Sequence, residues 1–121
     1  MANIKSYTDI EQSRKLAEIL PIESADMCYI IDYAESNIYG TDHFKLEVDT
    51  YGLEAQKRDN IPCWSLASLL DVLPNGIIMN KDSQNGKYHF SSTYVGTHIT
   101  ADNPVDACYE LIIKLKELNL L

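Results

Sequence analysis

Apolar and polar positions follow two different periods along this chain, and each period predicts a kind of element. Residues 8–20, 65–73 and 104–118 repeat apolar side chains every three or four positions, as helices do. Residues 43–49 and 87–94 alternate strictly, as strands with one buried face do. Short apolar runs at residues 27–33 and 76–81 predict two further strands.

The ends of the first and last helices carry local signals. Thr8 followed by Glu11 predicts a capping box with Thr8 as the N-cap, and Pro21 ends that helix. Asn103 is a good N-cap for the last helix, and Pro104 suits its first position. Both helices are therefore bounded by their own sequence.

The stretch at residues 61–74 lies between two β-rich segments and holds the only tryptophan, Trp64. Ser65 can cap a helix there, and Pro74 with Gly76 can end it. Its leucines fall on one face of that helix, namely Leu66, Leu69, Leu70 and Leu73. We expect a buried helix that joins two hairpins, with Trp64 as the largest side chain of the core.

Turn-forming residues connect the predicted strands. Residues 37–42 predict a turn before the strand at 43–49, in which Phe44, Leu46 and Val48 share the face expected to be buried. Residues 50–60 are polar and read as a surface connection. Asn85-Gly86 predicts a second hairpin, and residues 95–100 a further short strand bent around Gly96.

The predicted element order is α-β-β-α-β-β-α. The simplest packing is an α+β fold of two layers, a four-stranded, mainly antiparallel sheet with the helices on one face. At 121 residues, and without a linker-like segment, the chain is expected to form a single domain over residues 1–121.

Charge and cysteine content narrow the partners. The chain has 18 acidic and 10 basic residues, a net charge of −8, which disfavours nucleic acid and anionic membranes as partners. The three cysteines are far apart, and the first residues lack an apolar signal core. These features predict a reduced, cytoplasmic protein.

Cys63 admits two interpretations. A thiol beside a helix N-terminus can act as a nucleophile, with His43, His89 or His98 as its base. Alternatively, Cys63 is a small core residue beside Trp64, which we favour because no nucleophile motif surrounds it. The histidines and cysteines are too dispersed for a metal site. We predict no catalytic residue, no cofactor and no metal site.

Tyrosines are the better candidates for recognition. Tyr39 and Tyr51 lie beside turns and are expected to be exposed, whereas Tyr88, Phe90 and Tyr94 share a face and are expected in the core. The residues that could contribute to a pocket or an interface are Cys63, Trp64, Tyr39, Tyr51 and His89.

Three segments together resemble a known group of sequences. They are residues 8–16 leading on to Ala25-Asp26-Met27, then Ile61-Pro62-Cys63-Trp64-Ser65-Leu66 with Leu69-Leu70 and Leu73-Pro74, and Asn103-Pro104-Val105-Asp106-Ala107-Cys108. Their order and spacing are similar to small uncharacterised proteins of phages and gut Bacteroidetes genomes, often in mobile elements. The resemblance implies an accessory protein of phage or prophage type in the cytosol. It transfers no activity and no functional residue, and residues 35–60 lie outside it.

Two functions remain after these observations. The first is a non-enzymatic accessory protein that binds another protein, or itself, through a sheet face or edge. The alternative is a small enzyme or ligand-binding domain with a pocket near Trp64.

Overall fold

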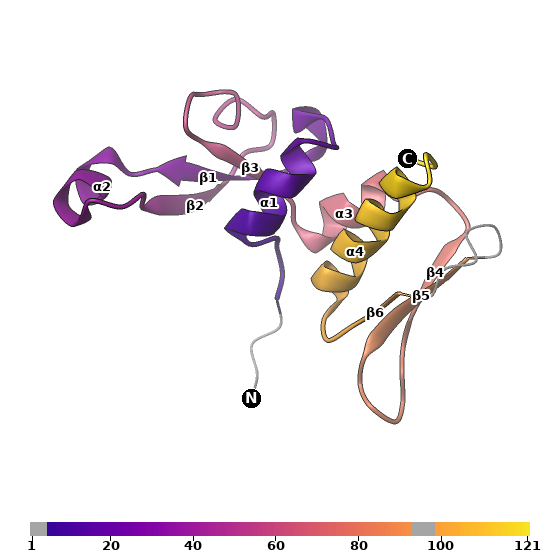
Figure 1. The fold of residues 1–121 in the computed structure, drawn as a ribbon. Helices are drawn as coiled ribbons and strands as arrows, with labels where there is room; N and C mark the ends of the chain where they lie inside the picture. The colour runs from indigo at the N-terminus through magenta and orange to yellow at the C-terminus, as the bar shows by residue number, and fades with distance from the viewer. Residues whose placement is uncertain (1–4, 93–98) are drawn as a thin grey trace.

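The computed structural model describes residues 5–92 and 99–121. It is an α+β structure in which helices and antiparallel strands alternate irregularly (Figure 1). The elements run in the order α1 (Ile10–Ala17), a 3-10 turn η1 (Ile22–Ser24), β1 (Met27–Ile31), α2 (Tyr33–Tyr39), β2 (Phe44–Val48), β3 (Ile61–Cys63), α3 (Leu66–Val72), β4 (Ile77–Lys81), β5 (Tyr88–Ser92), β6 (Ile99–Ala101) and α4 (Pro104–Glu117).

The described strands form two sheets instead of the single four-stranded sheet expected from the sequence. One sheet has the order β2-β1-β3 and the other the order β4-β5-β6, with antiparallel neighbours throughout. Helices α3 and α4 lie between the two sheets (Figure 1). The expectation failed because Ile61–Cys63 is a strand and not the lead-in to a helix. It occupies the edge of β1 that the second hairpin would have needed.

β3 tolerates a proline for a simple reason. In the pairing of β1 with β3, Met27 opposes Cys63, Cys28 opposes Pro62 and Tyr29 opposes Ile61. β3 lies at the edge of its sheet, where a residue without an N–H can point that side away from the ladder.

A short helix occupies the connection that the sequence predicted as a turn. Asp32 caps α2 by accepting from the N–H of Glu35 at 3.1 Å, and Gly40 ends it in the left-handed region at φ +72°. The predicted antiparallel pairing of the flanking strands is confirmed. We call residues 27–48, that is β1, α2 and β2, the arm, because this hairpin extends away from the other elements (Figure 1).

The first helix, predicted over residues 8–20, spans Ile10–Ala17 and is therefore shorter at both ends. Asp9 is the N-cap of α1, and it forms a capping box with Gln12. Thr8 cannot take that role because its side chain is engaged elsewhere: its hydroxyl oxygen accepts from the N–H of Trp64 at 3.2 Å and lies 2.7 Å from the Ser13 hydroxyl. A tertiary contact thus replaces the local cap.

The main core lies around α3, α4 and the second sheet, and it reaches Leu16 of α1. The predicted N-caps Ser65 and Asn103 are confirmed. Leu69 of α3 is fully buried, but Leu70 is exposed, so the apolar face of this helix is narrower than expected. Phe90 is buried and Tyr88 packs against the core as predicted, whereas Tyr94 lies outside the described residues.

Candidate functional site

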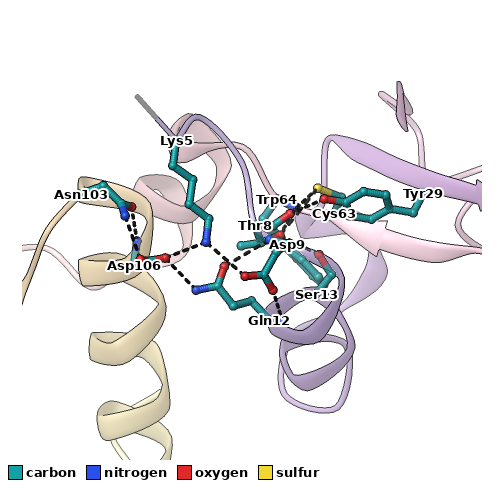
Figure 2. Close-up of polar contacts among 10 residues, drawn as sticks. All are labelled: Lys5, Thr8, Asp9, Gln12, Ser13, Tyr29, Cys63, Trp64, Asn103 and Asp106. Atoms are coloured by element: carbon teal, nitrogen blue, oxygen red, sulfur yellow. Dashed lines mark hydrogen bonds and ion pairs between the residues drawn. The ribbon is translucent and has the colours of Figure 1, made fainter. Parts of the chain in front are cut away.

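Cys63 and Trp64 lie at the junction of α1, β1 and β3, and neither side chain reaches solvent. The thiol Sγ lies 3.4 Å from the carbonyl oxygen of Thr8 and 3.6 Å from its hydroxyl. Tyr29 donates its hydroxyl to the same carbonyl at 2.7 Å (Figure 2). The indole Nε1 of Trp64 donates to the Ser24 hydroxyl at 2.9 Å. These contacts satisfy the polar atoms of a buried joint.

This environment does not activate the thiol. Burial raises the pKa of Cys63 above its ordinary value, although hydrogen bonds from Thr8, Ser13 and Tyr29 oppose that effect. A thiol with a raised pKa carries little thiolate at neutral pH, and thiolate is the reactive form. The geometry therefore supports the interpretation of Cys63 as a core residue.

The candidate bases are not assembled around Cys63. His43 precedes β2, where its ring lies 4.9 Å from that of Tyr39. His89 lies on β5 in the other sheet and is half-buried. His98 lies outside the described residues. In residues 5–92 and 99–121, no group of three or more His, Cys, Asp or Glu side chains is arranged to hold a metal ion.

A second polar cluster joins the start of the chain to α4. Lys5 binds Asp106 at 2.8 Å and Asp9 at 3.2 Å, and Gln12 donates to the same Asp106 oxygen at 2.8 Å (Figure 2). Burial opposes the charge on Asp106, but the bonds from Lys5, Gln12 and Asn103 outweigh it and lower its pKa. The carboxylate thus stays ionised and structural, with its acceptor positions occupied.

A cleft of about 630 Å³ opens between α1 and the arm. Arg14 contributes a positive charge to its lining, which also holds Asp42 and Asp59. The hydroxyl of Tyr33 donates to Asp59 at 2.9 Å, and Asp59 adopts φ +68°. The mixed charges select no single class of ligand. The apolar part of the lining consists of Ile31, Phe44 and Ile61.

Exposed apolar side chains concentrate on the arm and the loop that follows it. Tyr39 and Tyr51 are 64% and 80% exposed, which confirms their predicted exposure. The members within residues 33–53 are Tyr33, Ile38, Tyr39, Val48, Tyr51 and Leu53.

Strand β2 combines this exposure with an open edge. Val48, predicted to be buried, is 74% exposed, and Phe44 and Leu46 on the same face are only partly covered. On the opposite face, the carboxylate of buried Asp49 accepts from the N–H groups of Glu54 and Ala55. The loop after β2 is thus anchored at the end of the strand, and it leaves Lys45, Glu47 and Val48 exposed.

The five candidate residues chosen from the sequence therefore lie at three different places in the structure. Cys63 and Trp64 lie together in the buried joint, Tyr39 and Tyr51 are on the exposed arm and its following loop, and His89 is in the second sheet. Sequence reasoning missed β2 as an open edge. The sequence feature that could have indicated this edge is the run from Phe44 to Val48, in which the opposite charges of Lys45 and Glu47 flank Leu46.

Comparison with known proteins identifies no family for this chain. No family model, curated protein or solved structure matches this chain. Within the described part of the chain, no helix has both the length and the apolar content needed to cross a membrane.

Proposed function

We propose that this chain is a non-enzymatic interaction protein that binds another polypeptide along the outer edge of β2. The observation that carries the proposal is the exposure of Val48 on a strand that pairs with β1 alone in the described sheet. A partner in extended conformation can add to such an edge, where main-chain hydrogen bonds supply affinity and apolar side chains supply specificity.

The burial of Cys63 and Trp64 supports a binding role over a catalytic one. Cys63 and Trp64 present no surface to a substrate. His43 lies against Tyr39 before β2, and His89 lies on β5 in the other sheet. The exposed tyrosine and aliphatic side chains of this half of the chain lie instead on the arm and the loop that follows it. These side chains contribute contact area, and tyrosine is enriched in protein interfaces.

Photo-crosslinking in the native host tests the proposal. A benzophenone amino acid placed at Tyr51, beside the end of β2, should give discrete protein adducts. The same probe at Ile78, an exposed residue on β4, is the matched control and should give none. Equal labelling from both positions, or no adduct from Tyr51, would contradict the proposal.

A second substitution makes the test specific for the strand edge. Val48→Pro removes an N–H that points away from β1, so strand addition is blocked while the β1–β2 ladder is retained. Val48→Thr keeps the N–H and the β-branched shape. We expect the Tyr51 adduct to disappear in Val48→Pro and persist in Val48→Thr. An adduct equally strong in both variants would place the partner elsewhere.

A cytoplasmic accessory role of phage or prophage type fits this proposal and stays a prediction from the sequence resemblance. The genes beside this one provide the test. Phage structural or mobilisation genes as neighbours would support that setting, and housekeeping genes of one biosynthetic operon would count against it.

Ligand binding is the second candidate, at the cleft beside the arm and not at Trp64. The observation that favours it is the volume of about 630 Å³, which suits a small molecule. Thermal-shift screening with polar metabolites would test it, with Thr41→Trp as the variant that fills the cleft. A shift seen in the wild type and lost in Thr41→Trp is expected; no shift with any compound would remove this candidate.

A further inference from the structure

The outer edge of β2 has a defined set of main-chain groups. The N–H of Asp32 donates to the carbonyl oxygen of His43 at 2.7 Å, and the N–H of Asp49 donates to the carbonyl oxygen of Asp26 at 2.9 Å. The main-chain N–H and C=O groups of residues 43 and 49 therefore point toward β1. Because this orientation alternates along an antiparallel strand, Phe44, Leu46 and Val48 direct their N–H and C=O groups outward. In the described part of the chain, no hydrogen bond from another segment reaches those groups.

The outer edge of β2 is self-complementary. When two copies of β2 lie antiparallel about Leu46, Phe44 of one copy opposes Val48 of the other, and Leu46 opposes Leu46. All outward N–H and C=O groups of the three residues then pair. These apolar side chains lie on one face of the joined sheet, so the exposed Val48 is covered by an aromatic ring.

The charges on the other face select this register. Lys45 of each copy opposes Glu47 of the other, giving two pairs of opposite charge. A shift by two residues in one direction would place Lys45 opposite Lys45, and in the other direction Glu47 opposite Glu47. Lys45 is 70% exposed and contacts Asp32 only loosely, at 3.7 Å, so its ammonium group can reach a partner strand.

β2 also lacks two of the features that usually protect an edge strand, a proline and a bulge. It contains no proline, its five residues pair without a bulge, and its charges attract a second copy in the antiparallel register. We propose that the partner at this edge is a second copy of this chain, added antiparallel across a two-fold axis at Leu46. The β2-β1-β3 sheet of one copy and the same sheet of the other copy then form one continuous sheet of six strands. This inference deepens the proposed function and rests on it.

Charge reversal tests the register directly. Lys45→Glu should oppose Glu47 with a like charge in both cross-strand pairs, and Glu47→Lys should do the same with Lys45. We expect sedimentation equilibrium to show a wild-type dimer at submillimolar concentrations and a dimer dissociation constant about tenfold or more higher in each single variant. The double variant Lys45→Glu/Glu47→Lys restores opposite charges and should regain the wild-type constant.

Mixing the two single variants is a stronger test, because neither should dimerise well alone. One chain then carries two acidic groups and the other two basic groups at positions 45 and 47, so a heterodimer forms. Both positions are exposed, and unchanged circular dichroism and thermal melting will establish that each variant is folded. A monomeric wild type, or a dimer that is insensitive to both single substitutions, overturns the inference.

The outcomes separate this inference from the proposed function. A monomeric wild type that still forms a Tyr51 adduct with a different protein, lost in Val48→Pro, overturns self-association and leaves the proposed function intact. A dimer that is abolished by the charge reversals and restored by the double variant supports both. Absence of the dimer and of every adduct contradicts both.

Discussion

Both carboxylate oxygens of Asp26 accept hydrogen bonds from Ser65, Oδ1 from the backbone N–H at 2.9 Å and Oδ2 from the hydroxyl at 2.5 Å. The Ser65 hydroxyl oxygen in turn accepts from the N–H of Ser68 at 3.2 Å, where α3 begins. Asp26 immediately precedes β1. The pair therefore connects the start of the central strand of the first sheet to the start of the helix between the sheets.

Asp26→Ala should lower the free energy of unfolding by about 1–3 kcal/mol, because it leaves an N–H and a hydroxyl of Ser65 without their acceptor. Urea denaturation measures the change. Asp42→Ala removes an exposed carboxylate from the same half of the chain and should have little effect. Equal destabilisation by the two substitutions would contradict a structural role for the Asp26–Ser65 contact.

Trp64→Ala should lower the free energy of unfolding by about 3–5 kcal/mol, since it removes the largest fully buried side chain recorded in the structure. Ser24→Ala isolates the hydrogen bond to the indole and should cost about 1 kcal/mol. Thermal melts of both variants provide the measurement. A melt unchanged by Trp64→Ala would reopen a functional role for this residue.

The three cysteines should resist iodoacetamide in the folded protein. Burial raises the pKa of Cys28 to about 11 and that of Cys108 to about 12, and it raises the pKa of Cys63 as well. Intact-mass measurement should show no adduct under native conditions at neutral pH and three after unfolding in urea. Rapid labelling at Cys63 alone, without unfolding, would show that the thiol is accessible and activated.

Asp106→Asn should destabilise the protein by about 1 kcal/mol at neutral pH, because the contact with Lys5 loses its charge. The folded-state pKa of Asp106 lies below its ordinary value of 3.8, so its ionised form contributes fully above that value. The contribution disappears as the pH falls through the lower, folded pKa. The stability difference between wild type and Asp106→Asn should therefore shrink on acidification.

The control for this prediction lies at the alkaline end. Burial opposes the charge on Lys5, but the hydrogen bonds that its ammonium group donates to Asp106 and Asp9 outweigh that effect and raise its pKa. Its contribution is complete below 10.5 and is lost only as the pH rises through the higher folded value. A stability difference that stays constant from neutral pH to well below 3.8 would contradict the assigned ion pair.

Local rules predicted the elements whose signals lie within a few residues. Asn103 and Ser65 cap their helices with side chains that reach only three residues along the chain. Thr8 carried an equally good local signal, but its hydroxyl is used by Trp64, 56 residues away. Contacts over that separation leave no periodic trace in the sequence, so the N-cap was predicted at Thr8, one residue before the observed N-cap, Asp9.

The sheets and the candidate site were harder to predict for the same kind of reason. Ile61–Cys63 has three residues and a proline, so its pairing with β1 has no local signature. Alternation correctly placed Phe44, Leu46 and Val48 on one face. It could not show whether another element covers that face, and the exposure of Val48 depends on where α1 and the following loop pack.

The contact between Lys5 and Asp106 has a consequence for synthesis of the chain. The two residues are 101 positions apart, so a ribosome needs roughly 5–20 s after making Lys5 before Asp106 exists. During that interval the nascent chain can already contain β1, β2 and β3, with their edge open, while α1 lacks its anchor on α4. Chaperone demand should therefore be greatest for this unfinished intermediate, and slowed translation of the last third of the message should increase misassembly.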